Sequence, residues 1–509
     1  MRFDPEDFFA PDRLEKRQKL EEEGSDLYPH ESDRSCDLGT YREQFEDTEE
    51  IESEETFHLA GRITGNIRDL GDISFIDITD RTGTVQLFFS TDRLNDYDTL
   101  SHIDRGDFIG AEGTPMRANT GELSLQVQDF TVLTKALNHP PGHEGLSDEK
   151  KLRQRAVAMW DDDLHSNLSF RFKMIQKIRE YLTRQEFKEV ETPILQNVAG
   201  GTSARPFETE VNAKGTEMYL RIAKELYLKR MIVGGFERIF EIGKDFRNED
   251  IDTTHNPEFT MMEVYQAYAD YHDMMELTEN IVEYVLDELN GGDYEIEYHK
   301  PQRDDDGGIE RDDKGEVETE AVTLDFEPPW PRMTMTEAIE HYAGFDPTEL
   351  SNEEIQERAL EAGGEFPGGF SRGLGIMELF EELVEHRIDG PVFIIDHPVE
   401  TTPLCKDHRE KEGRIERFEI FVVGAELGNS YTELNDPIQQ GEHLAEQVER
   451  KEQGDEEAHS MDDDFLDALA YGMPPTGGLG IGIDRLAMIL TDTQSIKEVL
   501  PFPMVAQES

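Results

Sequence analysis

Residues 246–268 read FRNEDIDTTHNPEFTMMEVYQAY: an arginine-containing segment, a polar loop and a second segment of alternating character. If both flanks are strands, alternation sets Arg247 and Glu249 on one face, and Glu263 and Tyr265 on one face of the next strand. Such groups are unusual on paired strands, because burying an unpaired charge costs several kcal/mol. The pattern therefore predicts two adjacent strands whose charged side chains bind a ligand instead of packing in the core.

The chain has 509 residues, which predicts two or more domains. Hydrophobic residues at 36% are sufficient for folded cores, yet charged residues reach 32% and the formal net charge is −64. Acidic residues are spread along the whole chain. This composition fits either a surface adapted to high salt, as in a halophile, or a partly disordered acidic protein. The dense hydrophobic patterning after residue 165 favours the surface adaptation.

Several protein classes are excluded by what the sequence lacks. The two cysteines, Cys36 and Cys405, form no CxxC pair, which argues against a disulfide framework and against structural zinc. The N-terminus has no apolar signal segment, and no run approaches the roughly 20 apolar residues that cross a bilayer. We therefore expect a reduced, cytoplasmic protein without membrane association.

Changes in patterning along the chain predict an α+β protein. Residues 1–56 form an acidic N-terminal extension, read as a charged helix followed by a flexible lead-in. Short alternating segments over 57–137 predict a small β-barrel with the OB-fold as the leading candidate. A linker is expected at 138–160. Helices and strands alternate over 161–509, interrupted by an acidic surface insertion at 299–320.

The glycine-rich segment GGLGIGIDRL, residues 477–486, has two interpretations. It lacks the sixth-position glycine of the dinucleotide-binding fingerprint, and the sequence contains no GxxxxGK[ST] phosphate loop. Either the segment packs a strand-to-helix junction, or it binds nucleotide through another architecture.

Carboxylates are embedded among apolar residues in RFEIFVVGAELGNSYTEL, residues 417–434. Glu419 and Glu426 stand seven residues apart, and Asn429, Tyr431 and Glu433 then alternate as on a strand. A solvated strand face is one explanation. Hard oxygen ligands of this kind also suit Mg²⁺ bridged to phosphates, and glutamates beside tyrosine suit a cationic ligand.

Three segments, FKEVETPIL, FRNEDIDTTHNPEF and GLGIGIDR, resemble motifs 1, 2 and 3 of the class II aminoacyl-tRNA synthetases. Flanking segments such as GGTSARPFET and GAELGNSYTELND are similar to the lysine-specific members of subclass IIb, and the resemblance spans about residues 57–505. It implies a six- to seven-stranded antiparallel catalytic sheet flanked by helices, an OB-fold that binds the anticodon, and a homodimer formed through motif 1. It also implies an ATP-dependent lysine–tRNA ligase that uses Mg²⁺ and acts on L-lysine and tRNA(Lys).

The resemblance assigns site residues as well. It implies two catalytic residues: Arg247, which contacts the α-phosphate, and Arg485, which contacts the adenine and the γ-phosphate. The resemblance implies ATP contacts at Arg247, Glu249, His255, Asn256, Phe259, Glu419 and Arg485, and metal binding at Glu419 and Glu426. It implies lysine contacts at Gly201, Glu225, Glu263, Tyr265, Asn429, Tyr431 and Glu433, and anticodon contacts at Phe75, Gln86 and Glu122.

Within the lysine set, Tyr265 and Glu433 are expected to bind the ε-ammonium, and Glu225 with the Gly201 backbone the α-ammonium. Glu263 suits either end. None of these positions is cationic, which favours lysine over aspartate. Phe75 suits base stacking and barrel core equally.

Two other functions stay open on the residues alone. One is an aspartyl- or asparaginyl-tRNA synthetase of the same subclass. The other is a non-catalytic paralogue, in which an OB-fold binds nucleic acid and the second domain binds a regulatory ligand.

Overall fold

In the computed structural model the chain divides into two compact units, Met1–Leu146 and Ser147–Ser509. The structure describes residues 3–505 except 49–50, 52, 95, 142–144, 203, 303–309, 312–316, 367–368 and 453–459. Among the helices described, none is long and apolar enough to cross a membrane.

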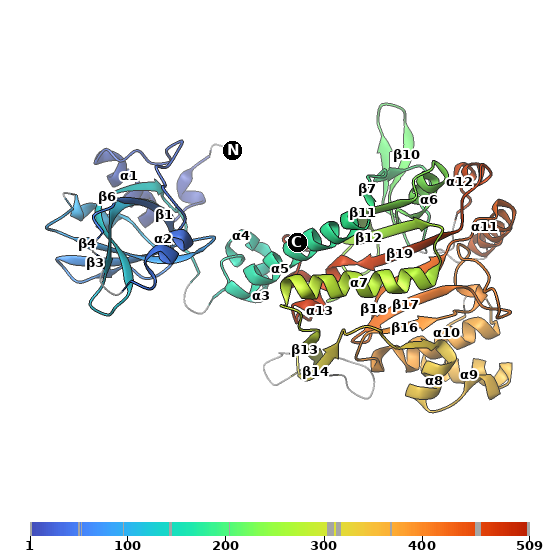
Figure 1. The fold of residues 1–509 in the computed structure, drawn as a ribbon. Helices are drawn as coiled ribbons and strands as arrows, with labels where there is room; N and C mark the ends of the chain where they lie inside the picture. Colours follow the sequence, from blue (N-terminus) through green and yellow to red (C-terminus); the bar gives the residue numbers. More distant parts are fainter. Residues whose placement is uncertain are drawn as a thin grey trace. The chain divides into compact units, whose positions relative to one another are not determined.

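The first unit is a closed β-barrel (Figure 1). Its strands follow the order β1-β5-β6-β4-β3-β2, and pairing of β1 with β3 closes the barrel. Every second residue points inward, so Ile76 and Ile78 are buried while Phe75 and Asp77 lie on the outer face. The strands are β1 (Phe57–Ile63), β2 (Arg68–Asp69), β3 (Ile73–Asp80), β4 (Gly83–Ser90), β5 (Phe108–Arg117) and β6 (Leu123–Thr134).

The acidic N-terminal region packs onto this barrel through two helices, α1 (Pro11–Glu22) and α2 (Leu38–Phe45). Leu20, Leu38 and Tyr41 are fully buried and belong to the barrel core. The expected flexible lead-in after the first helix is wrong at α2, because its few apolar residues share one buried face.

The second unit is built on an eight-stranded sheet in the order β15-β16-β17-β18-β19-β12-β11-β7. Its interior is antiparallel, but each edge pair, β15 with β16 and β7 with β11, is parallel. The expectation of six to seven antiparallel strands thus missed these short edge strands. The strands are β7 (Lys188–Glu189), β11 (Arg238–Phe246), β12 (Glu258–Ala267), β15 (Arg332–Thr334), β16 (Val392–Ile395), β17 (Arg417–Val422), β18 (Ala425–Thr432) and β19 (Thr476–Gly482).

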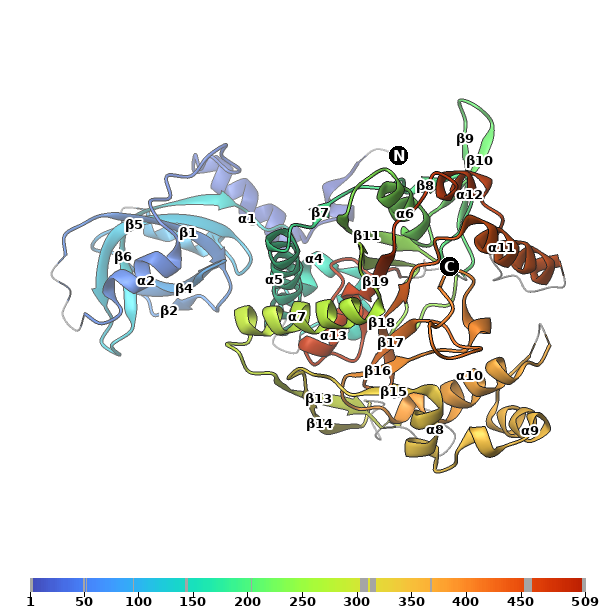
Figure 2. The same cartoon turned by 45° about the vertical axis from the view of Figure 1, so that its right-hand side comes forward.

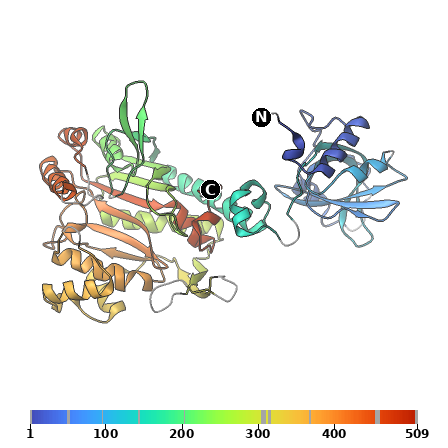
Figure 3. The ribbon, with the colours of Figure 1, turned by 180° about the vertical axis from the view of Figure 1, so that it is seen from behind.

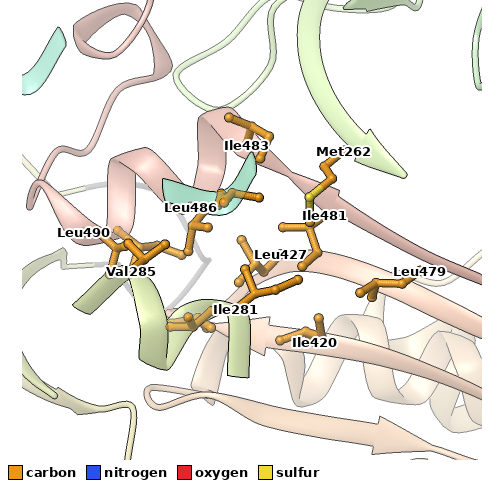
Figure 4. Close-up of a cluster of buried hydrophobic side chains, with 14 of the residues drawn as sticks. Met262, Ile281, Val285, Ile420, Leu427, Leu479, Ile481, Ile483, Leu486 and Leu490 are labelled. Carbon is orange, nitrogen blue, oxygen red and sulfur yellow. The ribbon is translucent and has the colours of Figure 1, made fainter. Parts of the chain in front are cut away.

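Three helices cover one face of this sheet: α5 (Asp162–Arg184), α7 (Tyr271–Leu289) and α13 (Ile483–Leu490) (Figure 2). Leu479 and Ile481 of β19 lie with Ile281 of α7 and Leu486 of α13 in one apolar cluster (Figure 4). Because side chains alternate along β19, Gly478 and Gly480 face the opposite side of the sheet. That opposite side holds the site.

The remaining elements of this unit surround the sheet. A hairpin of β9 and β10 stands out from it, green in Figure 3, and pairs with β8. Helices α8, α9 and α10 form a second small core beside β16. These elements are α3 (Asp148–Arg153), α4 (Arg155–Ala158), β8 (Leu195–Gln196), β9 (Glu208–Val211), β10 (Thr216–Leu220), α6 (Glu225–Val233), β13 (Glu295–Pro301), β14 (Thr319–Asp325), α8 (Met335–Ala343), α9 (Asn352–Ala362), α10 (Arg372–Leu383), α11 (Pro437–Glu452) and α12 (Asp463–Leu469).

Two predicted segments fall partly outside the described residues. Within the predicted linker, 138–160, the second unit begins at Ser147 and contains α3 and α4, and 142–144 lie outside the description. The predicted insertion, 299–320, begins and ends in the paired strands β13 and β14, and 303–309 and 312–316 lie outside the description.

Candidate active site

Two adjoining cavities lie on the face of the sheet that the three helices leave open. The larger has a volume of about 410 Å³ and the smaller about 40 Å³. Both are lined by Gly201, Thr202, Arg247, Met261, Asn429 and Tyr431, so the two cavities are continuous. One elongated ligand, or two ligands in contact, would fit this arrangement.

The larger cavity is lined by six of the residues that the resemblance assigns to ATP: Arg247, Glu249, His255, Asn256, Phe259 and Arg485. The strand expectation for two of them is wrong. Strand β11 ends at Phe246, so Arg247 and Glu249 belong to the loop that joins β11 to β12. The backbone N–H of Arg247 still donates to Pro257 O at 2.9 Å, which ties the two ends of that loop together.

The Arg247 guanidinium is free to meet an anion. Its carbon lies 5.1 Å from the centroid of the Phe259 ring, a cation–π distance. Its buried Nε has no hydrogen-bond partner among the described residues. A half-buried guanidinium whose buried nitrogen has no partner is costly beside a cavity unless a ligand completes its hydrogen bonds.

Arg485 lies in the first turn of α13, directly after β19, and contacts both the β11–β12 loop and β18. Its Nη2 lies 3.0 Å from Nε2 of His255, and its Nη1 donates to the carbonyl of Glu426. His255 is held in turn by Asp252, at 2.8 Å from Nδ1. Burial would raise the pKa of Asp252, but the hydrogen bond from His255 and nearby backbone donors lower it to about 2.

Asn256 lines the cavity with its amide already engaged. Its Nδ2 donates to Glu258 O at 2.6 Å, and its Oδ1 accepts from the Met504 backbone at 3.2 Å. The side chain therefore fixes the loop rather than presenting a free amide to a ligand.

The two predicted metal ligands lie on neighbouring strands. Glu426 lines the larger cavity and accepts from Asn429 Nδ2 at 3.0 Å. Glu419 lies opposite Asn429 on β17, does not line that cavity, and is ion-paired with Arg417. Burial, with the charges of Glu419 and Glu426, raises the pKa of Glu385 to about 7.

Hard carboxylate oxygens at these two positions fit Mg²⁺. The described residues contain no group of three or more histidine, cysteine, aspartate or glutamate side chains arranged as a metal site. Phosphate oxygens of a nucleotide would have to supply the remaining ligands.

The smaller cavity is lined by all seven residues assigned to lysine: Gly201, Glu225, Glu263, Tyr265, Asn429, Tyr431 and Glu433. Strands β12 and β18 flank β19, and register pairs Tyr265 and Tyr431 with Gly478. A Cβ on Gly478 would lie 1.9 Å from Glu433 Oε1. The glycine-rich segment is thus the junction between β19 and α13, and the glycines of its strand leave room for the cavity.

Three carboxylates, Glu225, Glu263 and Glu433, meet in this cavity and are at most 6% exposed. Burial raises the pKa of Glu263 to about 7 and that of Glu433 to about 8. Glu263 accepts from the Lys224 backbone at 2.9 Å, but Glu433 Oε1 has no hydrogen-bond partner in the part of the chain that is described. The cavity therefore favours a cation that donates hydrogen bonds.

A buried cation that was not predicted from the sequence contacts two of these carboxylates. Lys229 is fully buried, with Nζ 2.5 Å from Glu225 Oε1 and 2.5 Å from Glu433 Oε2. Lys229 is not one of the seven assigned positions, none of which is cationic, and it does not itself line the cavity. Its i+4 spacing from Glu225 on the buried face of α6 was the available signal.

The three predicted anticodon residues lie on the outer face of the barrel. Phe75 is opposite Phe88 in the β3–β4 register, their ring centroids are 5.3 Å apart, and neither ring belongs to the barrel core. Gln86 is buried on the same face of β4, and its Nε2 donates to Glu122 at 3.3 Å. Arg68 lies with its guanidinium carbon 5.6 Å from the Phe75 centroid.

Two family models match the chain. The model described as tRNA synthetases class II (D, K and N) matches residues 147–506. The model described as OB-fold nucleic acid binding domain matches residues 57–133.

Curated relatives match over nearly the whole length. A lysine–tRNA ligase of Methanospirillum hungatei is 43% identical, over 100% of this chain and 97% of the relative. One from Saccharolobus solfataricus is 46% identical over 88% of this chain and 87% of the relative. One from Sulfolobus acidocaldarius is 45% identical over 96% and 95% of the two chains.

Proposed function

Since the chain belongs to the class II tRNA synthetases (D, K and N), we propose that it is a lysine–tRNA ligase. It activates L-lysine with ATP and transfers the lysyl group to the 3′ end of tRNA(Lys), acting in the cytoplasm. The observation that carries this proposal is the smaller cavity, in which the buried Glu433 Oε1 has no partner among the described residues. An ammonium group supplies the hydrogen bond that this oxygen lacks.

The charges of the cavity favour lysine over the other substrates of the family. Aspartate would bring a carboxylate against Glu225, Glu263 and Glu433, and asparagine would bring no charge to offset them. Like charges at close range in a buried site cost several kcal/mol. Arg247 stands where the two cavities meet, which suits the substrate carboxylate and the α-phosphate of ATP.

The reaction then needs positioning more than a protein nucleophile. A carboxylate oxygen of lysine attacks the α-phosphorus in line, forming lysyl-adenylate and releasing pyrophosphate. A 2′- or 3′-hydroxyl of the terminal adenosine attacks the adenylate carbonyl carbon and releases AMP. Arg247 stabilises the charge that develops at phosphorus, and Arg485, held by His255, binds the adenine and γ-phosphate side.

Glu419 and Glu426 would hold Mg²⁺, which supplies charge neutralisation and orientation to the phosphates when bound. Within the protein, Arg417 is ion-paired with Glu419, and Asn429 donates a hydrogen bond to Glu426.

A homodimer formed through the first motif is part of this proposal. Phe172, Ile194, Leu195 and Phe236 are between 40% and 52% exposed in the single chain. Ile194 and Leu195 are consecutive residues of the first motif, and adjoining exposed apolar side chains are typical of an interface. Sedimentation should give the mass of two chains, and a monomer at micromolar concentration would contradict the assignment.

We also propose that the net charge of −64 is an adaptation to high salt. Self-repulsion within a dimer of two such chains destabilises the compact state, and roughly 1 M salt shortens the Debye length to about 3 Å. Dialysis into 0.1 M salt should therefore reduce ellipticity and activity. Full retention of both at 0.1 M would contradict the adaptation.

The experiment that tests the function is ATP–pyrophosphate exchange with each of the twenty amino acids. Lysine alone should support exchange, and the same preparation should charge tRNA(Lys). Exchange driven by aspartate or asparagine would identify another member of the family, and no exchange at all would favour a non-catalytic paralogue.

A further inference from the structure

Lys229 has no place in the reaction as proposed, yet it is the only described side chain that binds two of the cavity carboxylates at once. It lies on α6, with its Nζ 6.0 Å from the centroid of the Phe465 ring. It contacts Glu225 and Glu433 but does not itself line the cavity. Burial alone would lower its pKa, but the two carboxylates raise it above its ordinary value. Lys229 is therefore charged.

We propose that Lys229 is a positioning residue that sets the charge of the smaller cavity to match free lysine. Its ion pairs with Oε1 of Glu225 and Oε2 of Glu433 favour the ionised forms of both carboxyls against the effect of burial, and leave Oε1 of Glu433 directed at the substrate ammonium. This inference rests on the proposed lysine activation and adds the residue that makes the pocket discriminate by charge.

The charge balance carries the argument. Glu225, Glu263 and Glu433 give three negative charges when ionised, and Lys229 and Arg247 give two positive charges. The nearby cations Arg417 and Lys224 add no net charge, because they are paired with Glu419 and Asp245. The net charge of −1 is neutralised by free lysine, which carries two ammonium groups and one carboxylate. Without Lys229 the net charge would be −2, one negative charge more than lysine neutralises. A buried carboxyl would remove that extra charge by taking up a proton.

Glu433 is the carboxyl that would take up that proton. The titratable groups that interact with it are Lys229 and Glu225 of α6, Glu263 and Tyr265 of β12, Tyr431 of β18, and Cys405. Burial raises the pKa of Tyr265, Tyr431 and Cys405 above their ordinary values, so these groups stay neutral near pH 7. A protonated Glu433 binds the ε-ammonium less well, because the charge-assisted hydrogen bond is lost.

The first test is Lys229→Met in the full-length protein, assayed by pyrophosphate exchange from pH 6.5 to 9. The ratio of lysine KM between variant and wild type, which cancels the titration of free lysine, should be about ten to a hundred at pH 7. It should fall several-fold by pH 9 as Glu433 ionises, with kcat and the KM for ATP changed by less than about threefold. A ratio that is independent of pH would overturn the proposal.

A second pair of variants keeps the test valid if Lys229→Met does not fold. Glu433→Gln and the double variant Lys229→Met/Glu433→Gln both lack the carboxylate that Lys229 neutralises. Their KM values for lysine should agree within about threefold, because the effect of Lys229 through Glu433 is gone and only its weaker effect through Glu225 remains. A further tenfold rise in the double variant would overturn the proposal.

Lys135→Met is the matched control, since Lys135 is also fully buried between two carboxylates, Asp104 and Asp107. Its KM for lysine should equal that of wild type at every pH. Failure of wild type to activate lysine would refute the proposed function itself. Lysine activation by wild type with no pH-dependent change in Lys229→Met would refute only the role of Lys229.

Discussion

The two units each bury a lysine between two carboxylates, with opposite outcomes. In the first unit, Lys135 lies 2.6 Å from Asp104 and 2.8 Å from Asp107, and both carboxylates have further donors. Asp104 also binds Lys16, and Asp107 accepts from the Ala136 backbone at 2.8 Å. That network is complete within the chain.

In the second unit, Lys229 makes the same kind of bridge but leaves the network incomplete. Glu433 keeps one oxygen without a partner among the described residues, and that oxygen lies at a cavity. The Nε of Arg247, at the same cavity, is unpartnered too. A complete buried network stabilises a fold, whereas an incomplete one beside a cavity is expected to bind a ligand.

The largest effect should follow from removing the unpartnered cation. Arg247→Ala should lower exchange by about 10²–10³-fold, because one preorganised group that stabilises the reacting phosphate is lost. Circular dichroism should match wild type, since the side chain holds no other element in place. Near-normal exchange in a folded variant would show that this cation does not act on the phosphate.

The next effect concerns the unpartnered oxygen. Glu433→Gln should raise the KM for lysine about ten- to a hundredfold through loss of a charge-assisted hydrogen bond. The KM for ATP, bound in the larger cavity, should stay within about threefold. An equal rise in both constants would mean that the substitution disturbs the whole site instead of the ammonium contact.

A smaller effect is expected at the outer face of the barrel. Phe75→Ala should weaken charging of tRNA(Lys) by the roughly 1–3 kcal/mol of one stacked base, with lysine activation unchanged. Phe75 lies outside the barrel core, so the unfolding midpoint should shift little. Ile76→Ala, its buried neighbour, is the control that should lower stability. Unaltered tRNA charging in Phe75→Ala would remove this residue from the interface.

The smallest effect on activation should come from the complete network. Lys135→Met should lower the free energy of unfolding of the first unit by roughly 3–5 kcal/mol, because it strands Asp107 in the core. Lysine-dependent exchange, which depends on the second unit, should not change. A raised KM for lysine in this variant would break the distinction between the two networks.

The predicted α+β fold with an OB-fold barrel is confirmed, and local patterns explain why it was predictable. Alternation over 57–137 marked the short strands of the barrel, and it paired Glu263 with Tyr265 on the face of β12 that lines the smaller cavity. Alternation failed beyond Phe246, where Asn, Asp and Pro end the strand and leave Arg247 in a loop.

Long-range pairing was beyond the sequence. The i+4 spacing could have paired Lys229 with Glu225, but nothing in the local sequence brings Glu433, from a distant part of the chain, beside Lys229. The engaged amide of Asn256 depends likewise on the backbone of Met504. No local pattern encodes such contacts, because they form only when separate elements pack together.

The central claim is that Glu433 Oε1 is left unpartnered in order to bind the ammonium of lysine. A crystal structure of the protein with L-lysine tests this most directly. The prediction is the ε-ammonium within about 3.2 Å of Oε1, with Lys229 still bridging Glu225 and Oε2. A lysine bound elsewhere, with Oε1 still without a partner, would contradict it.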